Sequence, residues 1–501
     1  MKPIRKAHVA GTLLAVAGVA VSVGLGWSLL RIGIHGAPEG SGLPNILFVT
    51  LDGARADRLS VYGYGRETSP NIARVAKDGF AFSEAFTVAT YSGPSYATIF
   101  TGLFPLQHGL IDNGLRLSDE VMPLAELLQH SRYRTAGFIG EAILGSETNL
   151  DRGFDTFELH QVPTHKHDEK SLENEVAGFR AAKRWLETWR GDSGDQPPQP
   201  FFLWLHVQQI HQSYDPPPPY DSIYMDVPHD AEVRGIDDFE LRCASDVRKA
   251  FELGLLTEEM KSQVEALYDG EVRLVDDELG AIFDLLRQSG VYDDTIIVIV
   301  ADHGEHFFEE TEVDFGPGKF RHGRVYFDPV LRVPWILKPQ AGAQLKGGQQ
   351  PAVTASTVDM FPTVLDLLGL DKPSFLPGRS LMPWMKEPKQ SGGEGSIYFQ
   401  ETPSKRFYSG LRTADWKLVR KVKRGQTTRW LFNLETDPGE RANVESTNLE
   451  IADKLEQQLD EWLSQQSAVE PASLADMSEK MRQALRDAGY LRTEEEAGPE
   501  Q

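Results

Sequence analysis

The sequence predicts an α/β fold with a mostly parallel central sheet sandwiched by helices, followed by a smaller C-terminal α+β subdomain that carries an antiparallel sheet. Two patterns support this prediction. Up to about residue 370, continuous apolar runs of strand length alternate with helical patterns, and beyond it short segments alternate apolar and polar residues. The 501 residues suffice for one large domain and a small one.

Each apolar run predicts a strand that is buried on both faces of the sheet. The four runs span residues 45–51, 135–139, 201–205 and 295–300. The helical patterns lie at residues 124–130, 177–189 and 258–288. A helix therefore precedes each strand after the first, and strands that are joined through helices run parallel in one sheet.

The C-terminal part predicts a different arrangement. Residues 396–399 and 416–420 alternate as half-buried strands do, and residues 448–465 form a helical pattern. We therefore predict a C-terminal subdomain over residues 371–470, followed by a terminal helix and an acidic tail over residues 471–501.

The N-terminus predicts contact with a lipid bilayer. A basic cluster at residues 2–6 precedes an uncharged apolar run at residues 9–30, which is long enough to span a membrane. We predict a membrane anchor or signal sequence over residues 1–34 and a linker over residues 35–43. The positive flank keeps the N-terminus in the cytoplasm and the rest periplasmic or extracellular. The length of the run favours an uncleaved anchor, and cleavage would give a secreted protein.

Charge and cysteine content narrow the function classes. A formal net charge of −23 argues against a nucleic-acid partner, which requires a basic surface. It does not exclude an anionic small substrate, because a metal ion can invert the local field. The single cysteine excludes an internal disulfide. The oligomeric state stays open.

Metal-binding residue types gather where the predicted strands end. Asp52 follows the first strand, His206 follows the strand at 201–205, and Asp302 and His303 follow the fourth. Ligands of open α/β sheets bind beyond the carboxyl ends of the strands. An oxygen and a nitrogen ligand side by side suit a divalent cation such as zinc or manganese.

Ser92 is the candidate nucleophile. Pro94 and Gly102 delimit a short predicted helix, which places Ser92 at the helix N-terminus. The helix dipole there favours a developing alkoxide, and a nearby metal can lower the pKa of a hydroxyl. Two loop histidines, His211 and His322, are weaker candidates, since a lone loop histidine is more often a surface residue than a ligand.

From about Pro44 to Asn443, the order and spacing of several motifs resemble the sulfatase family, within the alkaline-phosphatase-like superfamily. These motifs are residues 45–52, 55–59, 68–71, 92–95, 101–102, 108–109, 153–155, 302–305, 332–334 and 437–441. The resemblance implies a catalytic domain over residues 44–370, in a membrane-anchored member of the bacterial type.

The resemblance also implies roles for single residues. One divalent metal ion is expected on Asp52, Asp302 and His303. The catalytic residues are expected to be Ser92, His211 and His322, where Ser92 acts as the serine or as formylglycine formed from it. Substrate contacts are expected from His206 and Tyr96.

Three departures from the family pattern bear on the chemistry. Tyr96 stands where the family motif has Arg, which weakens the signal for formylglycine formation. Gly53 replaces the second Asp of calcium sulfatases, which favours a transition metal. Gln209 stands where two-metal relatives have Asp, so that His211 and His322 either bind a second ion or contact the substrate directly.

These observations predict a metal-dependent hydrolase that cleaves sulfate esters through Ser92. One alternative is a phosphomonoester or phosphodiester hydrolase, or a phosphoryl head-group transferase, on the same scaffold. Another is a catalytically degenerate binding protein. The sequence does not distinguish calcium, zinc and manganese.

Overall fold

The computed structural model describes residues 42–162, 176–191, 199–225, 241–242, 244–313, 315, 322–393, 395–402 and 406–466, and isolated positions up to residue 482. The predicted anchor over residues 1–34 lies outside the described residues, as does the end of the acidic tail. Within the described ranges, no helix combines the length and the apolar composition needed to cross a bilayer.

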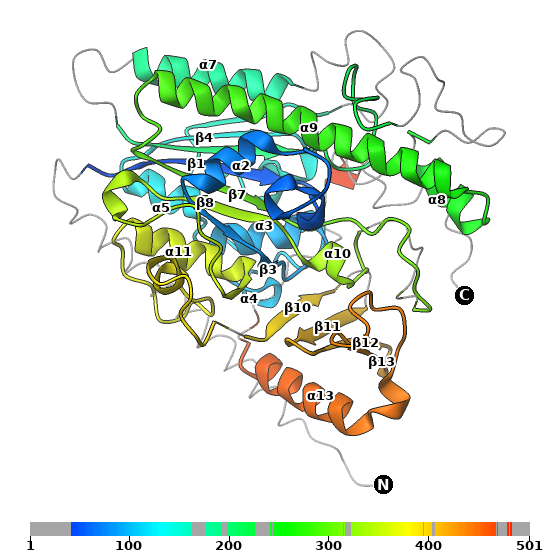
Figure 1. The fold of residues 1–501 in the computed structure, drawn as a ribbon. Helices are drawn as coiled ribbons and strands as arrows, with labels where there is room; N and C mark the ends of the chain where they lie inside the picture. Colours follow the sequence, from blue (N-terminus) through cyan, green and yellow to red (C-terminus); the bar gives the residue numbers. More distant parts are fainter. Residues whose placement is uncertain are drawn as a thin grey trace.

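A seven-stranded sheet forms the centre of the molecule, in the order β2-β8-β7-β1-β6-β4-β5 (Figure 1). Its strands are β1 (Asn45–Leu51), β2 (Phe80–Phe82), β4 (Arg134–Ile139), β5 (Thr156–Leu159), β6 (Phe201–Val207), β7 (Thr295–Ala301) and β8 (Trp335–Lys338). Strands β5, β4, β6, β1 and β7 pair in parallel, whereas β8 pairs antiparallel with β7 and β2 antiparallel with β8. The prediction of a mostly parallel sheet is confirmed.

Helices cover both faces of this sheet. One face carries α2 (Pro70–Lys77), α7 (Ala177–Gly191) and α9 (Glu258–Gln288), and the other carries α3 (Ser92–Thr101), α5 (Leu124–His130) and α11 (Met360–Leu367) (Figure 1). Every residue of β1, β6 and β7 is buried, which explains why these strands are continuously apolar in sequence. The predicted sandwich of helices around the sheet is therefore confirmed.

Short elements complete the larger domain. Strands β3 (Glu84–Phe86) and β9 (Thr354–Ser356) pair in parallel as a separate ribbon. The remaining short helices are α4 (Pro105–His108), α8 (Ala244–Glu252), α10 (Asp328–Leu331) and α12 (Met382–Lys386).

The C-terminal subdomain is a four-stranded antiparallel sheet backed by a helix, as predicted. Its strands are β10 (Ile397–Glu401), β11 (Phe407–Arg412), β12 (Trp416–Lys423) and β13 (Gln426–Asn433), and its helix is α13 (Leu449–Ser464). One apolar cluster joins Phe399 and Phe432 of this sheet to Phe86 and Phe327 of the larger domain. A second cluster joins the sheet to α13.

A buried ion network fixes the junction between the two parts. Lys417 of β12 is fully buried, and its Nζ lies 2.6 Å from Asp328 Oδ1 and 2.5 Å from Glu440 Oε1. Arg412 of β11 also bonds Asp328, at 2.8 Å. Burial disfavours ionisation of Asp328, but Lys417 and Arg412 outweigh it and hold its pKa well below the usual value.

Replacing Lys417 with Met is expected to lower the free energy of unfolding by about 3–5 kcal/mol, because the buried Glu440 loses its cation and Asp328 keeps only Arg412. Lys423→Met, at the exposed end of the same strand, is the matched control and is expected to change little. Equilibrium denaturation of both variants measures the difference. A loss below about 1 kcal/mol for Lys417→Met would contradict the proposed importance of the network.

Candidate functional site

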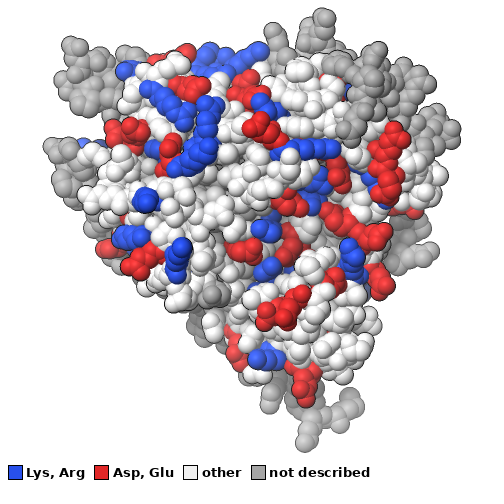
Figure 2. All heavy atoms as spheres, viewed as in Figure 1, with Lys and Arg blue, Asp and Glu red and all other residues white. Residues whose placement is uncertain are grey.

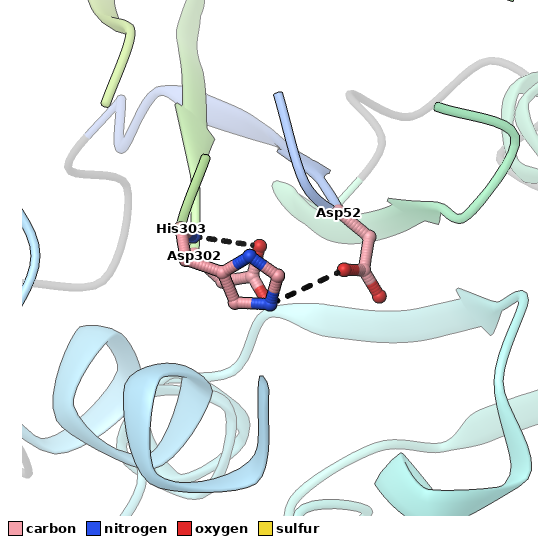
Figure 3. A group of neighbouring side chains, drawn as sticks. All are labelled: Asp52, Asp302 and His303. Atoms are coloured by element: carbon pink, nitrogen blue, oxygen red, sulfur yellow. Dashed lines mark hydrogen bonds and ion pairs between the residues drawn. The ribbon is translucent and has the colours of Figure 1, made fainter. Parts of the chain in front are cut away.

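The site forms where three neighbouring strands end. The parallel registers place Leu51 of β1 beside Ala301 of β7 and Val207 of β6. Asp52 follows β1 directly and Asp302 follows β7 directly, so the two carboxylates emerge side by side at the same edge of the sheet (Figure 3). Strand pairing thus brings together residues that lie 250 positions apart.

Asp52, Asp302 and His303 form a compact, fully buried group of metal-binding side chains. Their ligand atoms lie within 4.8 Å of one another. His303 Nε2 lies 3.3 Å from Asp302 Oδ2 and 3.7 Å from Asp52 Oδ1 (Figure 3). Both Asp52 oxygens and Asp302 Oδ2 are buried without a hydrogen-bond donor among the described residues. Buried oxygens of this kind fit the binding of a divalent cation.

Local hydrogen bonds orient these ligands. Asp302 Oδ1 accepts from the N–H of Gly53 at 3.2 Å and of His303 at 2.8 Å, so Oδ2 is the oxygen that faces the group. His303 Nδ1 lies 2.9 Å from the carbonyl of Gly304 and donates to it, because a carbonyl can only accept. The Nε2 lone pair therefore faces the carboxylates. Burial lowers the pKa of His303, which favours the neutral imidazole that a metal requires.

The pKa values of the two carboxyl groups, Asp52 and Asp302, shift in opposite directions. Burial disfavours the charge of Asp52, but His211, His206 and His303 hold its pKa well below the usual value. Burial and the charge of Asp52 raise the pKa of Asp302. Like charges at close range in a dry site cost free energy, and a dication removes that cost.

Ser92 lies beside this group. It is the first residue of α3, which begins two residues before the predicted start at Pro94, and its Oγ lies 3.4 Å from His303 Nε2. The hydroxyl of Ser95 donates to the carbonyl of Asp302 at 2.7 Å, which ties the helix N-terminus to the end of β7. Gly102 ends the helix as predicted, at a φ of 66°.

His211 and His322 face each other above His303. Their Nε2 atoms are 3.3 Å apart, and the ring of His322 stacks on that of His303 at 4.2 Å. His211 Nδ1 donates to the carbonyl of Gln212, and His322 Nδ1 lies 3.1 Å from Glu305 Oε2. Because both Nδ1 atoms face acceptors, the two Nε2 lone pairs meet, and a shared proton or a cation between them relieves the repulsion.

His206 and Tyr96 lie beneath the metal-binding group. His206 is the penultimate residue of β6, which continues two residues beyond its predicted end. Its Nδ1 accepts from the N–H of Gly140 at 3.1 Å, so Nε2 carries the proton and points at Asp52 Oδ2, 3.3 Å away. The fully buried ring of Tyr96 packs edge-on against it. Their predicted role in substrate binding stays a prediction.

Gly53 and Gln209, which differ from the family pattern, each lie in a defined environment. Gly53 adopts a φ of 72°, a left-handed conformation that favours glycine, and a Cβ there would lie 3.7 Å from the backbone of His211. Gln209 is buried. Within the described part of the chain, Asp52, Asp302 and His303 are the one group of three or more residues whose ligand atoms converge.

The family profile described as Sulfatase matches residues 44–370, and a profile described as N-sulphoglucosamine sulphohydrolase, C-terminal, matches residues 318–466. The chain belongs to the sulfatase family. An N-acetylglucosamine-6-O-sulfatase of Bacteroides thetaiotaomicron is 26% identical over 484 residues, which cover 80% of this chain and 82% of the relative. The multifunctional alkaline phosphatase superfamily protein PehA of Trinickia caryophylli is 25% identical over 422 residues, covering 71% of this chain and 80% of PehA.

Solved structures show the same fold. A protein in complex with its substrate D-glucosamine-2-N,6-O-disulfate superposes with a TM-score of 0.65 at 22% identity, covering 84% of this chain and 98% of that protein. The phosphonate monoester hydrolase of Agrobacterium radiobacter gives a TM-score of 0.62 at 21% identity, covering 84% and 95%. The sulfatase fold thus occurs with more than one kind of ester chemistry among these neighbours.

The sequence analysis missed Glu141 in this sulfatase-family site. It follows β4 after one intervening residue, Gly140, and is only 3% exposed. Burial, together with the charges of Asp52 and Asp302, raises its pKa well above the usual value. The rule that found Asp52 and Asp302, an acidic residue at the end of an apolar run, also indicates Glu141 when one further position is allowed.

His108, in the motif at residues 108–109, supports the helix that carries Ser92. It is fully buried, and its Nδ1 accepts from the N–H of Leu110 at 3.2 Å. The neutral ring therefore holds its proton on Nε2, which lies 3.2 Å from the Thr98 hydroxyl in α3. Burial lowers the pKa of His108 from 6.5 to about 3.

This low pKa predicts a loss of stability in mild acid. Below pH 6.5 the unfolded chain binds a proton at His108 that the folded chain rejects until about pH 3, so stability is complete above 6.5 and falls as the pH drops. Between pH 7 and 5 the loss from this residue is about 2 kcal/mol.

The test compares the full chain with its His108→Gln variant by denaturant titration at both pH values. The difference in unfolding free energy between the two proteins is expected to shrink by about 2 kcal/mol on going from pH 7 to pH 5. A difference that does not change with pH would mean that His108 has the same pKa in the folded and the unfolded chain, which contradicts the prediction.

Proposed function

We propose that this chain is a metal-dependent hydrolase of sulfate esters that uses the oxygen of Ser92, or of formylglycine formed from it, as its nucleophile. The observation that carries the proposal is the position of Ser92 Oγ, 3.4 Å from His303 Nε2 and next to the buried ligand group, at a helix N-terminus. The relatives named as sulfatases support sulfate as the transferred group.

Asp52, Asp302 and His303 are the residues that would hold the divalent ion. Among calcium, zinc and manganese, the mixed oxygen and nitrogen set of this group favours manganese or zinc. When bound, the ion polarises the ester and lowers the pKa of the nucleophilic hydroxyl.

The protein's own groups then account for the individual steps. The dipole of α3, whose N-terminus lies at Ser92, stabilises the anionic substrate and the developing negative charge. Ser92 Oγ, having lost its proton to solvent, attacks sulfur in line with the departing oxygen. The bond from sulfur to that oxygen breaks, and the oxygen takes a proton from the protonated pair of His211 and His322. Glu305 accepts the hydrogen bond of His322 Nδ1 and keeps that ring in position. Water then hydrolyses the covalent ester, which restores the Ser92 hydroxyl and releases sulfate.

Phosphoester chemistry is the second candidate. The fold neighbours include phosphonate monoester hydrolases, and PehA is described as a multifunctional member of the alkaline phosphatase superfamily. Tyr96 in place of Arg also reduces the support for formylglycine. A degenerate binding protein is the third candidate, favoured by the departures at Gly53, Tyr96 and Gln209.

We further propose that residues 9–30 hold the protein in a membrane, with the catalytic domain periplasmic or extracellular. The basic cluster and the long apolar run support this topology. The substrate would accordingly be an anionic ester outside the cytoplasm.

The deciding experiment assays an aryl sulfate, a phosphate monoester and a phosphodiester. It uses the full chain purified in detergent and treated with a chelator, to which calcium, zinc or manganese is then added back. Turnover of the sulfate is expected to depend on the added metal. Ser92→Ala is expected to lower turnover by about 10⁴-fold or more, because the nucleophile is lost.

Ser131→Ala, at the end of α5, is the matched control and is expected to keep full activity. Mass spectrometry of the peptide containing Ser92 distinguishes serine from formylglycine. Faster turnover of a phosphate ester would favour the second candidate. Equal turnover by Ser92→Ala and the wild type would exclude Ser92 as nucleophile, and no turnover with any metal would leave the binding protein.

A further inference from the structure

Glu141 is a buried carboxylate with no visible structural partner. It is 3% exposed, and neither of its oxygens has a hydrogen-bond donor among the described residues. No lysine, arginine or histidine in the described ranges forms an ion pair with it. Burying an ionised carboxylate without a partner costs several kcal/mol, so the position is unfavourable unless something else compensates the charge.

The nearest polar neighbours of Glu141 carry the same charge. Its carboxyl group contacts that of Asp52, and the charge of Asp302 also acts on it. Acidic side chains that follow β4, β1 and β7 therefore act on one another at the same edge of the sheet. The residue next to Asp52, Gly53, adds no side chain there. Three carboxylates in a dry interior are stable together when a dication lies among them.

His206 offsets the charge of Asp52, but among the described residues it forms no hydrogen bond or ion pair with Glu141. Its Nδ1 already accepts a hydrogen bond from Gly140, so the neutral ring directs an N–H, not a lone pair, towards Asp52. His206 can orient Asp52 by this contact but cannot ligate an ion through Nε2 in that tautomer. Glu141 is therefore left without a cationic partner among the described residues.

We propose that Glu141 is the third carboxylate of the metal site and raises its affinity for a divalent cation through its charge and through its contact with Asp52. Glu141 lies outside the group whose ligand atoms are within 4.8 Å, so it is a positioning residue behind Asp52. Partners in this position commonly change metal affinity 10- to 100-fold. The inference rests on the proposed metal dependence and assigns a further residue to it.

A competing explanation is that Glu141 stays protonated and donates its O–H to Asp52. Glutamine separates the two explanations. Its side chain has nearly the same shape, and its NH₂ group can donate in place of the acid O–H, but it carries no charge. Glu141→Gln therefore preserves a hydrogen-bonding role and removes an electrostatic one.

The experiment titrates Mn²⁺ into the full chain, purified in detergent and stripped with a chelator, and measures the Kd by calorimetry. Glu141→Gln is expected to raise the Kd about 10- to 100-fold. Asp276→Asn is the matched control, since Asp276 is a fully buried carboxylate that accepts from the backbone of Asn71 and Ile72 in α2 and has no contact with the metal-binding group. It is expected to leave the Kd within about twofold, as additivity of distant sites predicts.

Thermal unfolding gives an independent readout. Without metal, Glu141→Gln is expected to unfold at the same temperature as the wild type or higher, because it removes a buried repulsion. Added Mn²⁺ is expected to raise its midpoint less than that of the wild type. Replacing a residue that only fills space would shift the unfolding midpoint by the same amount with and without Mn²⁺. Glu141→Asp, which keeps the charge, is expected to bind Mn²⁺ more tightly than Glu141→Gln.

A Kd for Glu141→Gln within threefold of the wild type would overturn the inference and leave the proposed function intact. Failure of the wild type to bind Mn²⁺, Zn²⁺ or Ca²⁺ would instead overturn both. Because the readout is metal binding, the outcome does not depend on identifying the natural ester.

Discussion

The parallel pairing of β1 with β7 is the constraint on which the rest of the site depends. Neighbouring strands lie about 4.8 Å apart, so the residues that follow Leu51 and Ala301 must emerge within a few ångströms of each other. Asp52 and Asp302 cannot separate without breaking the most deeply buried strands of the protein. Ser95 then fixes α3 to the Asp302 carbonyl, which carries Ser92 to the same place. The site geometry is thus a consequence of sheet register.

That constraint has an electrostatic cost. The buried carboxyl groups of Asp302 and Glu141 have raised pKa values, whereas neighbouring histidines lower that of Asp52. An apolar core would avoid this conflict, and none of these charges is needed to hold the sheet together. The ion network around Lys417 differs, because there the buried acids have cationic partners. Uncompensated acids at strand ends fit a binding site, whereas compensated ones fit a structural junction.

The sequence predicts those strands whose residues are all buried alike from one end of the strand to the other. Strands such as β1 and β7 are buried on both faces, so their composition alone identifies them. Strand β5 is half exposed and β2 has three residues, and neither produces a comparable pattern. Because ligands bind beyond the carboxyl ends of parallel strands, the sequence predicts that Asp52 and Asp302 belong to the site. It does not predict the distance between the two side chains. The strand order and the tautomer of His206 depend on pairing with distant segments, which no local pattern contains.

Gly53 and Glu141 together indicate how this site differs from the family pattern. The left-handed backbone at Gly53, with a φ of 72°, favours glycine, so the position after Asp52 carries no side chain. Under the role proposed for Glu141, a carboxylate that follows β4 supplies acidic charge to the site from another strand and leaves the turn at Gly53 undisturbed. A degenerate binding protein would gain stability if a neutral residue replaced Glu141, whose buried oxygens have no hydrogen-bond donor among the described residues. The retained acid therefore favours a site that holds a cation.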